Sequence, residues 1–314
     1  MTPAVHGTGK YEQLLERCRT LQPVSTAVAH PCEASALAAV VDAAELGLIA
    51  PILVGPKAKI EEVAKTNGIV LGSIPIVDAP HSHASAARAV ELVRQGKAEL
   101  LMKGSLHTDE LLGAVVARET GLRTGRRLSH VFIMDVPTYH TVLIVTDAAI
   151  NIAPTLEDKV DICQNAIDLA RSFGVERPKV AILAAVEVVN SRMPATLDAA
   201  ALCKMAERGQ IKGGVLDGPL AFDNAISREA ADIKGIVSEV AGDPDILIAP
   251  DLEAGNMVAK QLSFLANADS AGLVLGARVP IILTSRADSV RSRIASCGVA
   301  VIAAHARRRA HATA

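Results

Sequence analysis

The sequence has few aromatic residues and almost no net charge, and both shortages limit what it can bind. Among 314 residues there is no tryptophan, and there are only two tyrosines and four phenylalanines. Proteins that hold single-stranded nucleic acid stack successive bases on several exposed aromatic rings. The formal net charge of −2 gives no general attraction to polyanions or to anionic lipid. We therefore expect neither a nucleic-acid nor a membrane partner.

Cysteines are also few, and they are scattered singly: Cys18, Cys32, Cys163, Cys203 and Cys297. Without a Cys-x-x-Cys pair or a Cys/His cluster, neither a zinc site nor a disulfide framework is expected. The odd number fits a reducing compartment. The N-terminal residues form no apolar signal segment, and no apolar run approaches the ~20 residues of a membrane span. The sequence thus predicts a cytoplasmic protein.

What the chain does contain is an alternation of short apolar runs and longer segments of helical period. Half of the residues are apolar, and the length allows two domains of ordinary size. Strands are predicted over residues 24–29, 99–102 and 246–249, and helices over 33–48, 82–95 and 156–173, among others. This alternation predicts an α/β protein with mostly parallel sheets and helices on both faces.

Three later segments carry specific expectations. Residues 121–127 are basic and rich in turn formers, so we interpret them as a domain crossing. Residues 130–136 and 141–146 lie close together and predict an antiparallel hairpin. Pro219 lies within the strand predicted over 215–222 and implies an edge, a bend or an interruption. A helix is predicted over 227–240, although Gly235 weakens it.

The most informative stretch is the apolar run 281–283 and the polar residues that follow it. Thr284, Ser285 and Arg286 stand between this strand and a helix predicted from 290 to about 304, which Asp288 or Ser289 can cap. In open α/β sheets, ligands bind outside the carboxyl ends of the strands. Helix N–H groups and the Arg286 guanidinium together suit an anion. The alternative is an ordinary turn with a solvated arginine.

Polar side chains follow three other predicted strands in the same way, and we expect them to bind substrate. They are Lys103 and His107, Asp147 and Asn151, and Asp251 and Asn256. Their repetition suggests a ligand cleft at one edge of a sheet. Individually, the aspartates can instead cap helices, and His107 can satisfy a backbone carbonyl. Signatures of dinucleotide binding (Gly-x-Gly-x-x-Gly), serine hydrolysis (Gly-x-Ser-x-Gly) and zinc hydrolysis (His-Glu-x-x-His) are absent.

Five of these segments, taken in order, resemble the phosphate acetyltransferase/phosphate butyryltransferase family: 101–107, 144–154, 216–223, 249–256 and 283–286. The stretches 102–104 and 146–154 look closer to the butyryltransferase branch. The resemblance implies reversible transfer of an acetyl, butyryl or similar short acyl group between coenzyme A and inorganic phosphate. It implies no metal or redox cofactor, because coenzyme A is a substrate and its thiolate attacks the acyl phosphate directly in a ternary complex.

The resemblance also implies an isocitrate/isopropylmalate dehydrogenase-like fold, with an interdomain cleft and a homodimeric assembly. The first α/β domain would combine residues 1–126 with 276–314, and the second would span 127–275. Two other readings stay open. One is a non-catalytic paralogue that binds coenzyme A or a partner protein, and the other is a dehydrogenase on the same fold.

By the same resemblance, Ser285 hydrogen-bonds the reacting thiol or carbonyl, and Arg286 binds phosphate and stabilises the developing charge. The chain departs from the acetyltransferase pattern at two positions. Ser292 stands where that branch has an aspartate proposed as the thiol's base, so either Asp288 takes this role or electrostatics alone supplies the thiolate. Ala114 stands where that branch has an arginine, and Lys103 is the alternative cation.

Overall fold

The computed structural model describes residues 9–285 and 288–312, which fall into two compact units. The central unit is Arg127–Ser270, and the discontinuous unit joins Gly9–Arg126 to the chain from Ala271 onward. We expected the return at residue 276. It comes at Ala271 because β10 (Asp269–Leu275) pairs antiparallel with β11 (Ile281–Ile282), with Leu273 opposite Ile282.

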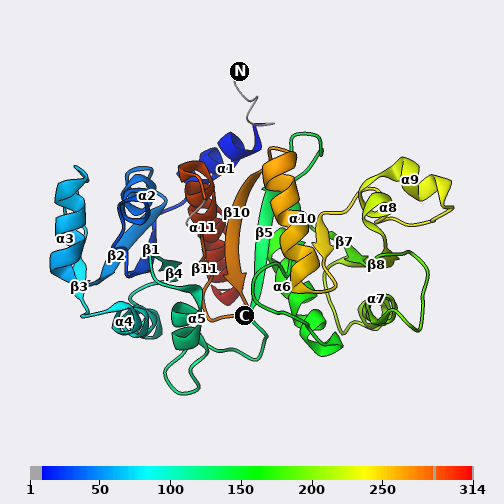
Figure 1. The fold of residues 1–314 in the computed structure, drawn as a ribbon, viewed down its shortest axis with the longest axis horizontal. Helices are drawn as coiled ribbons and strands as arrows, with labels where there is room; N and C mark the ends of the chain where they lie inside the picture. The colour runs from blue at the N-terminus through cyan, green and yellow to red at the C-terminus, as the bar shows by residue number, and fades with distance from the viewer. Residues whose placement is uncertain (1–8, 286–287, 313–314) are drawn as a thin grey trace. The chain divides into compact units, whose positions relative to one another are not determined.

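The discontinuous unit is an α/β layer structure (Figure 1). Besides β10 and β11 it contains α1 (Lys10–Arg19), β1 (Val24–Ala29), α2 (Ala34–Glu45), β2 (Ile49–Gly55), α3 (Lys57–Thr66), β3 (Ile76–Asp78), α4 (Ser82–Arg94), β4 (Leu100–Lys103), α5 (Thr108–Val116) and α11 (Val290–Ala312). The strand order is β3-β2-β1-β4-β11-β10, and every pair except β11–β10 is parallel.

Helices cover both faces of this sheet. Helices α2, α3 and α11 contact one another in series on one side, and α4 packs with α5 on the other. Helix α4 shows why the segment folds this way: Ala86, Ala89, Val90 and Val93 are buried at helical spacing. The central strands β1 and β4 are buried along almost their whole length, as expected for strands covered on both faces.

The central unit has the same architecture. It contains β5 (Ser129–Asp135), β6 (Leu143–Thr146), α6 (Leu156–Ser172), β7 (Lys179–Leu183), α7 (Pro194–Glu207), β8 (Val215–Leu220), α8 (Phe222–Ile226), α9 (Arg228–Ile233), β9 (Ile246–Ile248) and α10 (Leu252–Leu265). The strands run in the order β5-β6-β9-β7-β8, and only β5–β6 is antiparallel. Helices α6 and α7 pack against the sheet together, whereas α10 contacts β5 and β6, and α8 contacts β7.

Several local predictions for the central unit are confirmed. The antiparallel β5–β6 pair is the predicted hairpin. Pro219 lies in β8, which is the last strand in the order, so its missing N–H breaks no ladder bond inside the sheet. Helix α6 starts with a reciprocal capping box: the Thr155 hydroxyl accepts the Asp158 N–H at 3.2 Å, and the Asp158 carboxylate accepts the Thr155 N–H at 3.1 Å.

Two helix predictions are wrong in extent. The helix predicted over 227–240 is only α9, Arg228–Ile233, because Gly235 adopts a left-handed φ of 68° and ends it. Helix α11 continues to Ala312 instead of about 304. Among the described helices, none combines the length and the apolar character that crossing a membrane requires.

Candidate active site

The strand ends of the discontinuous unit bring two predicted site residues, Lys103 and Ser285, to one edge of its sheet. Strands β1, β4 and β11 are parallel, with Ala29 opposite Lys103 and Met102 opposite Ile282. Their carboxyl ends therefore lie side by side. Lys103 ends β4, and Ser285 is the third residue after β11. This edge is where an open α/β sheet binds its ligand.

Ser285 and Asp288 close a tight turn between β11 and α11. The Ser285 N–H donates to Asp288 Oδ2 at 2.6 Å, and the Asp288 N–H donates to the Ser285 carbonyl at 3.2 Å. Of the two predicted caps of α11, it is Ser289 that serves, because its hydroxyl accepts the Ser292 N–H at 3.1 Å. The Ser285 residue is exposed, whereas Asp288 is half-buried. Arg286, predicted to bind phosphate, lies outside the described residues.

Burial raises the pKa of the Asp288 carboxyl above its ordinary value. The Ser285 N–H, then the charge of Arg293, then that of Lys103 oppose this shift. Lys103 is only 7% exposed, and its Nζ donates to the Gly104 carbonyl at 3.3 Å. Two largely buried cations, Lys103 and Arg293, therefore lie near the turn. This arrangement suits anionic substrates.

A hydrogen-bonded group next to Lys103 joins the ends of β1 and β4. The Ser105 hydroxyl donates to the His30 carbonyl at 2.7 Å and accepts the Cys32 N–H at 3.0 Å. His30 has a left-handed φ of 54°, which is uncommon for a residue other than glycine. Its Nδ1 lies 3.1 Å from the Ser85 hydroxyl. Since that hydroxyl donates to the His81 carbonyl at 2.8 Å, Nδ1 is the donor in this contact.

His107 lies at the start of α5, where its side chain is exposed and makes no capping hydrogen bond. It follows β4 by four residues, so it belongs to the same strand exit as Lys103. The alternative weighed for it, a bond to a backbone carbonyl, is not observed among the described residues, and its binding role stays a prediction.

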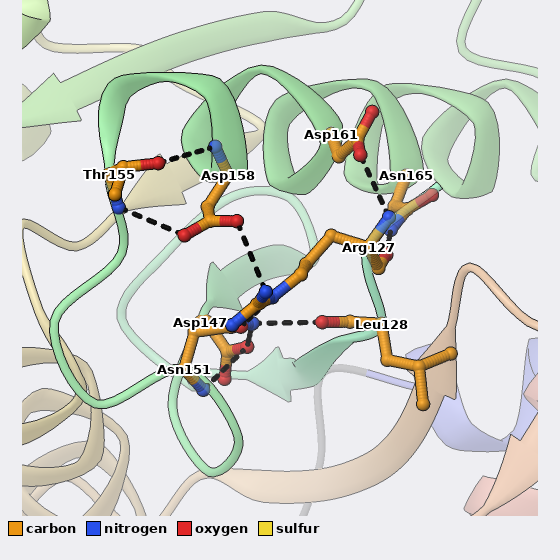
Figure 2. Close-up of polar contacts among 8 residues, drawn as sticks. All are labelled: Arg127, Leu128, Asp147, Asn151, Thr155, Asp158, Asp161 and Asn165. Atoms are coloured by element: carbon orange, nitrogen blue, oxygen red, sulfur yellow. Dashed lines mark hydrogen bonds and ion pairs between the residues drawn. The ribbon is translucent and has the colours of Figure 1, made fainter. Parts of the chain in front are cut away.

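In the central unit, Asp147 is the centre of a loop held by its own carboxylate (Figure 2). Asp147 is 2% exposed, and Oδ1 accepts the N–H groups of Ala149 and Ile150 at 2.8 and 3.0 Å. Oδ2 accepts the His130 N–H at 3.2 Å, the Asn151 N–H at 3.3 Å and the Asn151 amide at 2.5 Å. These bonds occupy both oxygens from within the chain, so the carboxylate shapes the loop.

Asn151 extends this network to an arginine that we had assigned only to the domain crossing. Arg127 donates from Nε to Asn151 Oδ1 at 2.8 Å, and its Nη1 lies 3.4 Å from Asp158 Oδ1 (Figure 2). Its backbone is fixed to α6 as well, by Asp161 at 2.8 Å and by Asn165 at 3.0 Å. Arg127 is exposed, so the network presents a cation held by two partners at the surface of the unit.

Asp251 and Asn256 lie at the exit of β9. Asp251 caps α10 by accepting the Ala254 N–H at 2.9 Å, which was the alternative reading of this residue. The Asn256 amide donates to the Ala148 carbonyl at 2.9 Å. Between them, Gly255 packs directly on the Asp147 loop, since a Cβ there would lie 2.2 Å from the Asp147 carbonyl oxygen. Both predicted binding residues thus have structural partners, and substrate binding by them stays a prediction.

The residues that sequence reasoning missed are His30, Arg127 as a network member, and Arg293. A histidine or arginine without a motif gives no signal in one sequence. Within residues 9–285 and 288–312, no group of three or more His, Cys, Asp or Glu side chains is arranged to hold a metal ion.

The fold defines the class of protein. Its structure matches that of a branched-chain phosphotransacylase from Enterococcus faecalis, with a TM-score of 0.79 and 30% identity over 90% of this chain and 99% of that one. A phosphotransacetylase from Streptococcus pyogenes has the same fold, with a TM-score of 0.80 at 21% identity over 96% and 100% of the two chains. The protein is therefore an α/β enzyme of the phosphotransacylase fold.

Sequence comparison gives the family. The profile described as phosphate acetyl/butaryl transferase matches residues 82–304, so the chain belongs to this family. It is 64% identical to a phosphate acetyltransferase of Rhizobium meliloti, over 96% of this chain and 95% of the relative. It is 41% identical to the phosphate butyryltransferase of Clostridium acetobutylicum, over 94% and 98%.

The higher identity to the phosphate acetyltransferase than to the phosphate butyryltransferase contradicts our assignment to the butyryltransferase branch. We based that assignment on residues 102–104 and 146–154. The structure shows that these stretches carry internal contacts, such as the Asp147 carboxylate bonded to its own loop. Such contacts hold the backbone and give no information on the size of the acyl group.

Proposed function

We propose that this enzyme is a phosphate acetyltransferase, which moves an acetyl group reversibly between coenzyme A and inorganic phosphate. The observation that carries the proposal is the 64% identity to a phosphate acetyltransferase over nearly the whole of both chains. The positive charges of Lys103 and Arg293 beside the Ser285–Asp288 turn support it, because acyl phosphate, phosphate and coenzyme A are all anions.

The proposed reaction is a direct displacement with both substrates bound. The coenzyme A thiol gives up its proton, and the thiolate sulfur attacks the acyl carbonyl carbon. The carbonyl electron pair moves to oxygen and then returns, and the carbon–oxygen bond to phosphate breaks. Because a free thiol has a pKa of about 8.5, little thiolate forms near neutral pH without a base or nearby cations.

We propose Asp288 as the proton acceptor, since it lies in the turn that carries Ser285. Oδ2 is engaged by the Ser285 N–H, and Oδ1 has no hydrogen-bond partner among the described residues. Ser285 would donate to the reacting carbonyl or thiol, and Arg286 with Lys103 would bind the phosphate. In this proposal Asp147, Asn151, Asp251 and Asn256 act indirectly, by shaping the strand exits, whereas His107 keeps its predicted role in binding substrate.

We further propose that the enzyme acts in the cytoplasm as a homodimer. Each chain of the dimer would have two α/β domains. All five cysteines are free thiols, which suits a reducing compartment. Helix α10 exposes Met257, Phe264 and Leu265, which are 60%, 75% and 81% exposed. Large apolar side chains grouped in this way are typical of surfaces that associate.

The test measures thiol consumption when the purified protein meets free coenzyme A and either acetyl phosphate or butyryl phosphate. We expect turnover with both donors and a higher kcat/KM with acetyl phosphate. Preference for butyryl phosphate would contradict the acetyl assignment and keep the reaction class. No turnover in a folded protein would contradict the enzyme assignment and favour a non-catalytic role in binding coenzyme A or a partner.

A further inference from the structure

Arg293 reaches both ends of the Ser285–Asp288 turn from the first turn of α11. The residue is only 6% exposed. Its Nη2 donates to the Ser285 carbonyl and its Nε donates to the Asp288 carbonyl, each at 3.3 Å. One planar guanidinium therefore spans the turn, with a separate donor for each end.

Burial of a guanidinium is unfavourable unless its donors are bonded and an opposite charge lies near. The turn supplies both: two backbone carbonyls accept the donors, and the Asp288 carboxylate is close enough for the Arg293 charge to act on it. The Ser285 peptide is fixed from both sides as a result. Its N–H is held by Asp288, and its carbonyl is held by Arg293 and by the Asp288 N–H.

We propose that Arg293 is a positioning residue for acyl transfer, which orients Ser285 and Asp288 toward the reacting thiol and carbonyl without touching substrate. This inference rests on the proposed function. A guanidinium suits the task because its donors form a rigid fork, whereas a lysine ammonium is a single point charge that cannot span two carbonyls in fixed geometry. Small displacements of a reacting group are expensive: a shift of ~1 Å costs about 100-fold in rate.

The experiment compares Arg293→Met and Arg293→Lys with Arg291→Lys as a matched control. Arg291 lies in the same helical turn, but its guanidinium stacks 3.7 Å from the centre of the Tyr11 ring and pairs with Glu12 at 3.1 Å. We expect kcat to fall about 100-fold in Arg293→Met and about 10-fold in Arg293→Lys, with each KM within about threefold of the parent. The control should keep the parent kcat.

A second comparison separates positioning from simple stabilisation. In a Ser285→Ala, Asp288→Asn background, Arg293→Met should lower kcat by no more than about threefold, because Arg293 acts through the two side chains already removed. If Arg293 had a purely structural role, Arg293→Met would lower Tm. Its effect on kcat would then multiply with that of the background substitutions. If Arg293→Met fails to fold, Arg293→Lys carries the same comparison.

Failure of this inference is distinguishable from failure of the proposed function. An active parent whose kcat is unchanged in folded Arg293 variants would overturn the positioning role alone. Full multiplication of the Arg293 effect in the Ser285→Ala, Asp288→Asn background would do the same. A folded parent without turnover would overturn the proposed function and this inference with it.

Discussion

Among single residues, Asp288 is the proposed proton acceptor, and its surroundings shift the pKa of its carboxyl. Burial raises its pKa, and the Ser285 N–H, Arg293 and Lys103 offset part of the rise. A carboxyl accepts a proton only when it is ionised. The rate should therefore fall as pH decreases through this pKa, and the fall should come above the ~3.9 of a solvent-exposed aspartate.

The corresponding test is the pH profile of kcat/KM in the parent and in Asp288→Asn. The asparagine can still accept the Ser285 N–H through its Oδ1, so the turn is preserved while the base is lost. We expect kcat/KM to drop by about 100-fold to 10,000-fold and the acid limb to disappear. The exposed Asp109 in α5 offers the control Asp109→Asn. An unchanged acid limb in Asp288→Asn would assign the proton transfer to another group.

Single residues also show why the site was only partly predictable. Asp288 was proposed through the family resemblance, and Ser285 was first predicted because it follows a clear apolar strand. Asp147 and Asp251 were found by the same rule, and both proved to hold backbone N–H groups. A polar residue at a strand exit can bind a ligand or cap the chain, and the sequence pattern is the same for both.

At the scale of the element, β1 packs closely against the exit of β4 beside Lys103. A Cβ on Gly104 would lie 2.4 Å from the Ala29 carbonyl oxygen and 2.6 Å from that of His30. The Gly104 N–H donates to the same Ala29 oxygen at 2.8 Å, so the strands cannot separate without losing this bond. Residue 104 must therefore be glycine if Lys103 and Ser105 are to keep their positions.

We therefore expect Gly104→Ala to lower the free energy of unfolding by about 1–3 kcal/mol and to reduce kcat as well. Gly113 in α5 is the matched control, because an added Cβ there meets no atom within 4 Å. Gly113→Ala should raise stability by about 0.5–1 kcal/mol, as expected for alanine in a helix. Denaturant unfolding of both variants tests this, and equal effects at the two positions would contradict it.

The boundaries of elements were predictable where local chemistry sets them. The capping box at Thr155 and the glycine stop at 174 define α6 from a few adjacent residues. The helix predicted over 227–240 failed because we gave its apolar spacing more weight than Gly235. A single left-handed glycine ends a helix whatever periodicity follows it.

For the whole molecule, the prediction concerns the proposed homodimer. Sedimentation equilibrium should give about twice the 32.7 kDa chain mass. Replacement of Phe264 and Leu265 on α10 by glutamate should shift the mass toward one chain if that face is the contact. Replacement of the equally exposed Val70 in the discontinuous unit is the control. A monomeric parent would contradict the dimer.

The sequence by itself determined the α/β class, the parallel strands and the hairpin, because apolar periodicity and turn chemistry are local properties. Its resemblance to known motifs gave the family. The sequence also placed Ser285 and Asp288 at a strand exit. Only the tertiary structure decided what each polar group contacts. The bonds from Arg293 to the turn, from Ser105 to His30, and from Arg127 to Asn151 join residues 8, 75 and 24 positions apart. Such pairs leave no periodic pattern in a sequence, since chain packing alone brings them together.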